Sequence, residues 1–249
     1  MDDHRLVELA LFAVTGFVAQ IIDATLSMGY GVSATTLLLS FGVPPAAASA
    51  SVHTAEVVAT AFSAYNHWRL KNVIAAFVKR LLIPGVVGAI AGAYVLTAVP
   101  GDAIKPFMAA YLIVMGAMIL LKAWRRAMPA ASPRHLTPLG LVGGFCDSIG
   151  GGGWGPIVAG TLLARGTEPR TTIGSVAFSE FFVTFASAAT LLLTIGIGNW
   201  LPIAGLALGS ALASPLAARL TGRIPARPLM IAVGVVVILL SLRTIWTAI

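Results

Sequence analysis

The sequence has few charged side chains and almost no cysteine. Asp, Glu, Lys and Arg make up only 10% of its 249 residues, whereas an ordinary soluble domain carries about 25%, so the chain lacks the surface that water requires. Cys146 is the single cysteine, which excludes an intrachain disulfide and a cysteine-based metal cluster. The sequence also lacks the period-2 alternation of a membrane β-barrel. It shows neither a Ser/His/Asp nor a Cys/His arrangement, so we expect no enzyme activity, no cofactor and no bound metal.

Long apolar runs are abundant in this chain. The hydrophobic fraction is 58% and the mean hydropathy is +0.93. Runs of roughly 20 residues recur along the chain, which is the length that crosses a hydrocarbon core as a helix. They predict an all-α, multi-pass protein of the cell inner membrane, surrounded by membrane lipid. The net charge of +7 fits Lys and Arg in short loops that fix orientation, rather than nucleic-acid binding.

Glycine-rich interruptions divide the apolar segments. Three of the ten segments, at 28–42, 138–148 and 154–164, are short, and they flank the glycine-rich stretches at 28–31 and 150–155. Backbone that is broken at membrane depth is tolerated only where protein or a water-filled cavity satisfies it. The segments lie at about 6–22, 28–42, 46–67, 79–99, 104–124, 138–148, 154–164, 170–194, 200–219 and 227–248.

The two halves of the chain are related in sequence. Adding 124 to positions 16–63 gives the same residue at 14 of 48 places, including the acidic pairs Asp23/Asp147 and Glu56/Glu180. Acidic matches are improbable by chance in a chain with nine acidic residues. We therefore predict a tandem duplication, with a first transmembrane repeat at 1–124, a cytoplasmic linker at 125–137 and a second repeat at 138–249, all in one membrane domain.

Positive charge predicts the relative orientation of the repeats. The loop at 68–80 holds four Lys or Arg residues while its counterpart at 193–203 holds none, and the bias reverses between 98–105 and 219–228. The two repeats are therefore expected to be inverted in the membrane. Each would be a broken or re-entrant helical hairpin, at 6–42 or 138–165, followed by three spanning helices. The expected cytoplasmic loops are 68–80, 122–138, 165–170 and 219–228, with both termini outside.

Four acidic residues and one histidine are the candidate coupling groups. Asp23, Glu56, Asp147 and Glu180 lie in or beside apolar segments, where an ionisable group is costly and is therefore functional by default. His53 precedes Glu56 by one helical turn and could share a proton with it, although Ala177 occupies the equivalent place in the second half. The alternatives are structural: protonated glutamates that join helices, and aspartates that cap the helices after the breaks.

The glycine breaks are candidate anion sites. Half-helices that begin near Tyr30 and Trp154 would point their positive N-terminal ends toward the membrane centre, where backbone N–H groups bind anions. Close packing by glycine is the competing explanation. The predicted substrate-binding residues combine these backbone groups, the two aromatic side chains and nearby hydroxyls: Ser27, Gly29, Tyr30, Gly31, Ser51, Gly151, Gly152, Gly153, Trp154, Gly155 and Ser175.

Three motifs carry a resemblance to a known family. These are Gly-Gly-Phe-Cys-Asp-Ser-Ile-Gly-Gly-Gly-Gly-Trp-Gly-Pro at 143–156, Ser-Val-His-Thr-Ala-Glu at 51–56, and Ile-Gly-Ser-Val-Ala-Phe-Ser-Glu at 173–180. With them the chain resembles the sulfite exporter TauE/SafE permeases over essentially its whole length. The first-half counterpart of the glycine motif is degenerate. The resemblance implies secondary transport of sulfur oxyanions or organosulfonates.

The sequence thus predicts a permease that moves a small sulfur anion by alternating access, with proton coupling and homo-oligomerisation left open. One alternative is a cation- or proton-coupled carrier in which the four acids bind the transported ion. Another is a passive anion channel. The sequence does not specify the solute or the direction of transport.

Overall fold

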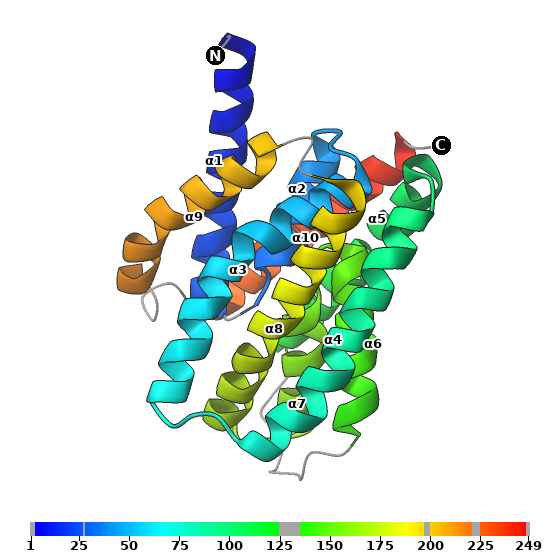
Figure 1. Ribbon diagram of the computed structural model, residues 1–249. Coiled ribbons are helices and arrows are strands. Elements are labelled where there is room, and N and C mark those ends of the chain that lie inside the picture. Colours follow the sequence, from blue (N-terminus) through cyan, green and yellow to red (C-terminus); the bar gives the residue numbers. More distant parts are fainter. Residues whose placement is uncertain (1–2, 27, 125–134, 197–199, 221–224, 248–249) are drawn as a thin grey trace.

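In the computed structural model the protein is an all-helical bundle (Figure 1). The structure describes residues 3–26, 28–124, 135–196, 200–220 and 225–247. Within these residues it contains ten α-helices and one π-helix, and no strand. The predicted all-α fold is confirmed. Most of the predicted linker and the predicted site residue Ser27 lie outside the described residues.

Each half begins with a helix that is interrupted at the predicted glycines. In the first half α1 (Asp3–Leu26) is followed by α2 (Tyr30–Ser40). In the second half α6 (Leu136–Gly150) is followed by the π-helix η1 (Gly155–Ala159) and by α7 (Gly160–Ala164). The 11 residues of α2 extend about 16 Å at 1.5 Å per residue. This helix is therefore too short to cross a bilayer, as the sequence predicts for the segments beside the breaks.

Positive backbone φ angles explain where these helices stop. Gly29 has φ 104° and Gly151, Gly152 and Gly153 have φ 67°, 149° and 155°. Residues with a Cβ rarely adopt such angles, whereas glycine adopts them at little cost. The glycines therefore end one helix and let the chain begin the next in a new direction.

Three long helices follow each hairpin. They are α3 (Pro45–Arg69), α4 (Ala75–Ala98) and α5 (Gly101–Trp124) in the first half, and α8 (Pro169–Ile195), α9 (Trp200–Leu220) and α10 (Ala226–Trp246) in the second. Pro45 and Pro169 start equivalent helices at a position where the missing N–H has no helical partner. Among the described helices α1, α4, α5, α8 and α10 are long and apolar enough to span a membrane.

Helix pairing joins the two halves throughout the bundle. α1 packs along α9 and α4 along α6, while α3 packs along α8 and α5 along α10. Glycine allows the closest approaches: a Cβ at Gly209 would overlap the carbonyl of Ala13, and one at Gly144 would overlap the carbonyl of Gly85. Equivalent helices thus have equivalent partners, as two related repeats require. The inversion of the repeats stays a prediction.

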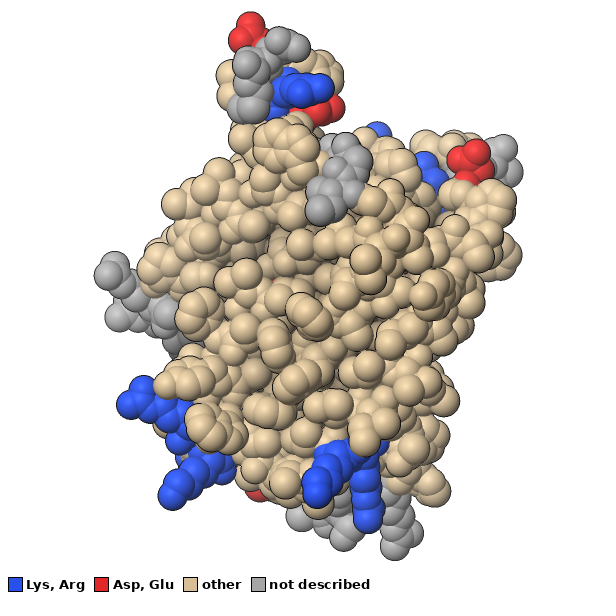
Figure 2. Space-filling view, viewed as in Figure 1, with Lys and Arg blue, Asp and Glu red and all other residues tan. Residues whose placement is uncertain are grey.

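The outer surface matches a membrane environment. A wide belt without Lys, Arg, Asp or Glu separates the few charged side chains, and Lys and Arg gather toward one end of the visible face (Figure 2). Many large hydrophobic side chains are exposed on the surface, among them Phe62, Phe107 and Leu193. Both termini lie at the other end, and the loop that joins α3 to α4 lies at the end rich in Lys and Arg (Figure 1). The protein is therefore a multi-pass integral membrane protein.

Candidate functional site

The two helix breaks touch each other in the interior. A Cβ at Gly31 would lie 2.6 Å from the Cα of Gly152 and 2.8 Å from the carbonyl oxygen of Gly151. Two hydroxyls hold the second break in place. Thr35 Oγ1 donates to the Gly151 carbonyl at 2.5 Å, and the Tyr111 hydroxyl donates to the Gly152 carbonyl at 2.9 Å. Close packing of backbone on backbone is thus one role of these glycines.

Several backbone N–H groups of the breaks already have partners within the protein. Gly152 N–H donates to the Asp147 carbonyl at 3.0 Å, and Trp154 N–H donates to Asp147 Oδ1 at 2.8 Å. In the first half the Tyr30 N–H pairs with the Asp23 carboxylate in the same way. Both aspartates therefore cap the helix that follows their break, which was the structural alternative for these residues. A substrate that bound these N–H groups would have to displace a carboxylate.

Asp147 is also paired with a histidine. Its Oδ2 lies 3.0 Å from His53 Nε2, and both side chains are almost fully buried. The other ring nitrogen, Nδ1, lies 2.8 Å from the carbonyl oxygen of Ser49. The sequence suggested Glu56 as the partner of His53, but the histidine of α3 instead reaches across to α6.

The four candidate acids converge on one region of the interior. Glu56, which is only 9% exposed, interacts electrostatically with Glu180, Asp147 and Asp23. Glu56 and Glu180 come from the middle of α3 and α8, and the aspartates come from the ends of α1 and α6. The structure thus brings together four carboxyl groups that are far apart in sequence.

A small polar cavity of about 240 Å³ opens beside these acids. Asp23 and Glu180 both line it, and η1 forms one wall. None of its lining residues is Lys or Arg. The cavity is lined by Gln20, Asp23, Ala59, Ser63, His67, Gly155, Ala159, Ile173, Val176, Ala177 and Glu180.

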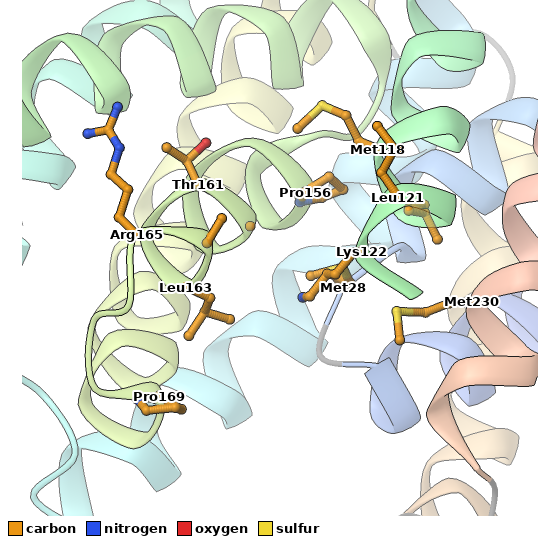
Figure 3. A pocket seen from close by; sticks show the side chains of 13 residues that line it. Met28, Met118, Leu121, Lys122, Pro156, Thr161, Leu163, Arg165, Pro169 and Met230 are labelled. Carbon is orange, nitrogen blue, oxygen red and sulfur yellow. The ribbon is translucent and has the colours of Figure 1, made fainter. Parts of the chain in front are cut away.

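A larger cavity of about 770 Å³ lies against η1 and α7 as well (Figure 3). Its wall is mainly apolar, and it includes two basic residues, Lys122 and Arg165, and no acidic one. Lys122 Nζ lies 3.4 Å from the sulfur of Met28. We call this space the basic vestibule. It is lined by Met28, Met118, Ile119, Leu121, Lys122, Pro156, Gly160, Thr161, Leu163, Ala164, Arg165, Pro169 and Met230.

The other predicted binding side chains make contacts within the bundle. Ser51 and Ser175 donate to carbonyls in their own helices at 2.7 Å, and Ser175 also accepts from the Ile74 N–H at 2.9 Å. The Tyr30 hydroxyl lies 2.8 Å from Ser210 Oγ, and Trp154 Nε1 donates to the Val176 carbonyl at 3.2 Å. Substrate contacts for these four residues stay a prediction.

Sequence reasoning missed several residues that the structure places at the site. Tyr111 holds the second break, Gln20 lines the small cavity and Lys122 lines the basic vestibule. Lys122 could have been noticed, because it stands at the end of an apolar run. For Tyr111 and Gln20 the sequence carries no signal that separates them from packing residues. Within the described part of the chain, no group of three His, Cys, Asp or Glu side chains is placed to hold a metal ion.

Comparison with known proteins agrees with a transporter. A family model described as sulfite exporter TauE/SafE matches residues 12–244. The chain is 40% identical over 248 residues to a Bacillus subtilis (strain 168) protein named "Probable membrane transporter protein YtnM", covering 96% of this chain and 83% of that protein. No solved structure matches the chain.

Proposed function

The chain belongs to the sulfite exporter TauE/SafE family, and we propose that this membrane transporter is a secondary carrier that moves a small sulfur-containing anion together with protons. The observation that carries the proposal is the convergence of Asp23, Glu56, Asp147 and Glu180 beside two broken helices. Discontinuous helices and an ion site at the interface between repeats are the usual construction of a secondary transporter.

The acids support proton coupling. Carboxylates that share a buried space repel one another and an incoming anion, because the interior screens charge poorly. Bound protons remove both repulsions. A protonated carboxyl group is also a hydrogen-bond donor, so the Glu180 side chain of the small cavity could then hold a sulfur oxyanion. An anion would therefore occupy this cavity only with protons, which couples the two fluxes.

The basic vestibule supports an anionic solute. Lys122 and Arg165 are the charged residues of its wall, and basic groups raise the local concentration of an anion and speed its approach. The walls of both cavities include residues of α8 and of the short segment η1. We infer that the solute passes from the basic vestibule to the acidic cavity along this segment.

The two cavities support alternating access. The basic vestibule includes Arg165 and Pro169, and the small cavity includes His67 and Ile173. These residues lie near the loops 70–74 and 165–168 that join α3 to α4 and α7 to α8. In this conformation both cavities are thus associated with the end of the bundle that the sequence predicts to be cytoplasmic.

Counterflow in proteoliposomes tests the proposal. Vesicles loaded with unlabelled sulfite should take up labelled sulfite in a saturable manner, and organosulfonates or sulfate should compete according to their affinity. Glu180→Gln should leave the protein folded and remove part of the pH dependence. Protein-free vesicles are the control. A flux that rises linearly with concentration and shows no counterflow would instead establish a channel.

A cation-coupled carrier is the second candidate, because Asp23 and Glu180 line the small cavity and none of its lining residues is Lys or Arg. Net uptake into unloaded vesicles that requires a sodium gradient at constant pH would favour this reading. Net uptake driven by a pH gradient in sodium-free buffer would favour protons.

A further inference from the structure

We propose that His53 and Asp147 act as one proton-binding pair that latches the second helix break onto α3, and that release of its single proton frees this break to move during transport. The inference rests on the proposed proton-coupled carrier, and it assigns one proton of that carrier to the pair of atoms His53 Nε2 and Asp147 Oδ2. It also makes the two halves of the site functionally different.

The hydrogen-bond partners of His53 determine how many protons the pair holds. Nδ1 lies 2.8 Å from the Ser49 carbonyl oxygen, which can only accept, and 3.2 Å from Ser49 Oγ, whose hydrogen is donated to the Ser148 carbonyl. Nδ1 therefore carries a hydrogen. Nε2 lies 3.0 Å from Asp147 Oδ2. One further proton must lie between these two atoms, either as imidazolium against carboxylate or as imidazole against carboxylic acid. Both arrangements have the same net charge.

Loss of that proton converts an attraction into a repulsion. A nitrogen lone pair would then face a carboxylate oxygen at the same 3.0 Å, with both side chains almost completely buried. The interior offers little screening for this repulsion. The two side chains would have to separate, and the helices that carry them would separate with them.

Asp147 transmits this separation to the break itself. Its second oxygen, Oδ1, accepts the Trp154 N–H at 2.8 Å, so the same carboxylate joins α3 to the start of the helix that follows the break. The neighbouring residue adds a second link, because Ser49 Oγ donates to the Ser148 carbonyl at 2.7 Å. Movement of Asp147 away from α3 therefore displaces the segment that walls both cavities.

Among the residues that the structure describes, the first half shows no such latch. Asp23 caps the Tyr30 N–H as Asp147 caps that of Trp154, but Ala177 occupies the position equivalent to His53. An alanine cannot hold a proton. The latch is therefore confined to one half, and Asp23→Asn is a matched control for Asp147→Asn.

Other titratable groups face the pair and enter the interpretation of any pH profile. Glu56 of α3 and Glu180 of α8 interact electrostatically with Asp147. Tyr111 of α5 and the adjacent Cys146 do so as well. A pH-dependent step belongs to the latch only if it requires both His53 and Asp147.

The single native cysteine provides a reporter that needs no substrate. Cys146 precedes Asp147 and is partly exposed, so its rate of modification by a maleimide reports opening of the break. In purified protein across a pH series, we expect the wild-type rate to rise with increasing pH beyond the rise that a free thiol shows. His53→Gln and Asp147→Asn keep a hydrogen bond that does not titrate, so both should lose the additional rise. His53→Ala removes the bond and should label about tenfold faster at acidic pH, as expected for one hydrogen bond to a charged group.

Counterflow across the same pH series separates this inference from the proposed function. His53→Gln and Asp147→Asn should lose the same pH-dependent step in the transport profile, and the double variant should lose no more than either single variant. Asp23→Asn should keep the step in labelling. A wild-type step that persists in His53→Gln, or losses that add in the double variant, would overturn the latch. If Cys146 labelling shows the pH-dependent step that requires both His53 and Asp147 but no sulfite counterflow is found, the proposed solute is wrong and the latch is still supported.

Discussion

Replacing Gly31 by alanine tests whether the contact between the two breaks holds the site together. The new Cβ would lie 2.6 Å from the Cα of Gly152, whereas carbon atoms pack best at about 3.5–4.0 Å. The α2 helix must therefore move by roughly 1 Å relative to the second break. The same movement stretches the bond from Thr35 Oγ1 to the Gly151 carbonyl, now 2.5 Å, beyond hydrogen-bonding range.

The energetic consequence can be worked from these contacts. Overpacking costs about 1–3 kcal/mol and the stretched hydrogen bond about 1 kcal/mol. Alanine recovers about 0.5–1 kcal/mol because it is the better helix residue. The net loss of about 1–3 kcal/mol corresponds to a fall in Tm of roughly 2–12 °C for a chain of this length.

Thermal unfolding of the purified protein and sulfite counterflow are the two assays. Gly160→Ala is the matched control, because its Cβ would lie 3.8 Å from its nearest neighbour, the Gly155 carbonyl oxygen, in ordinary van der Waals contact. We expect Gly31→Ala to lower both Tm and transport, and Gly160→Ala to keep the wild-type Tm or raise it. An unchanged Tm and full transport in Gly31→Ala would refute the idea that the breaks support each other.

Three further predictions concern single side chains. Tyr111→Phe should lower the free energy of unfolding by about 1–3 kcal/mol, because it leaves the buried Gly152 carbonyl without its hydrogen-bond donor. Tyr65→Phe is the control: this side chain is 52% exposed, and its replacement should leave Tm unchanged. Lys122→Met should raise the KM for the anion about two- to fivefold with little change in kcat, because Lys122 lines the basic vestibule. Lys79 is exposed, and an equal rise in KM for Lys79→Met would contradict this role of Lys122. Hydrogen bonds from the Thr171 side chain and from the backbone N–H groups of Thr171 and Arg170 hold the pKa of Glu168 below its usual value. The Glu168 cap therefore stabilises α8 at neutral pH, and this stabilisation is lost as the pH falls through that pKa. Tm measured from neutral to acidic pH should decline less in Glu168→Gln than in the wild type.

Local signals in the sequence were enough to predict where the helices break. A glycine run within an apolar segment indicates positive φ angles, and the structure has them at Gly29 and at Gly151–Gly153. The start of α2 at Tyr30 follows from the same signal. The acids could be selected because an ionisable residue in an apolar run is rare whatever surrounds it.

The contacts across the bundle could not be predicted in this way. His53 and Asp147 are 94 residues apart, and the nearer Glu56 was the simpler partner on one helical face. Glu56, Thr60 and Ser63 are spaced to share one face of α3, and this spacing is also only partly informative. Ser63 lines the small cavity, whereas Thr60 Oγ1 donates to the Glu56 carbonyl of its own helix at 2.9 Å. Helical periodicity indicates which residues share a face, but it does not indicate what that face meets.

The π-helix η1 makes the boundary between the cavities sensitive to helical register. Gly155 and Ala159 face the acidic cavity, whereas Pro156 and Gly160 face the basic vestibule. A π-helical turn contains about one residue more than an α-helical turn. Conversion of η1 to regular α-helix would therefore turn α7, which follows it directly, by about 100°, the angle between successive residues of an α-helix. A change in hydrogen-bond spacing over five residues would thus exchange the side chains presented to the two compartments without moving any long helix.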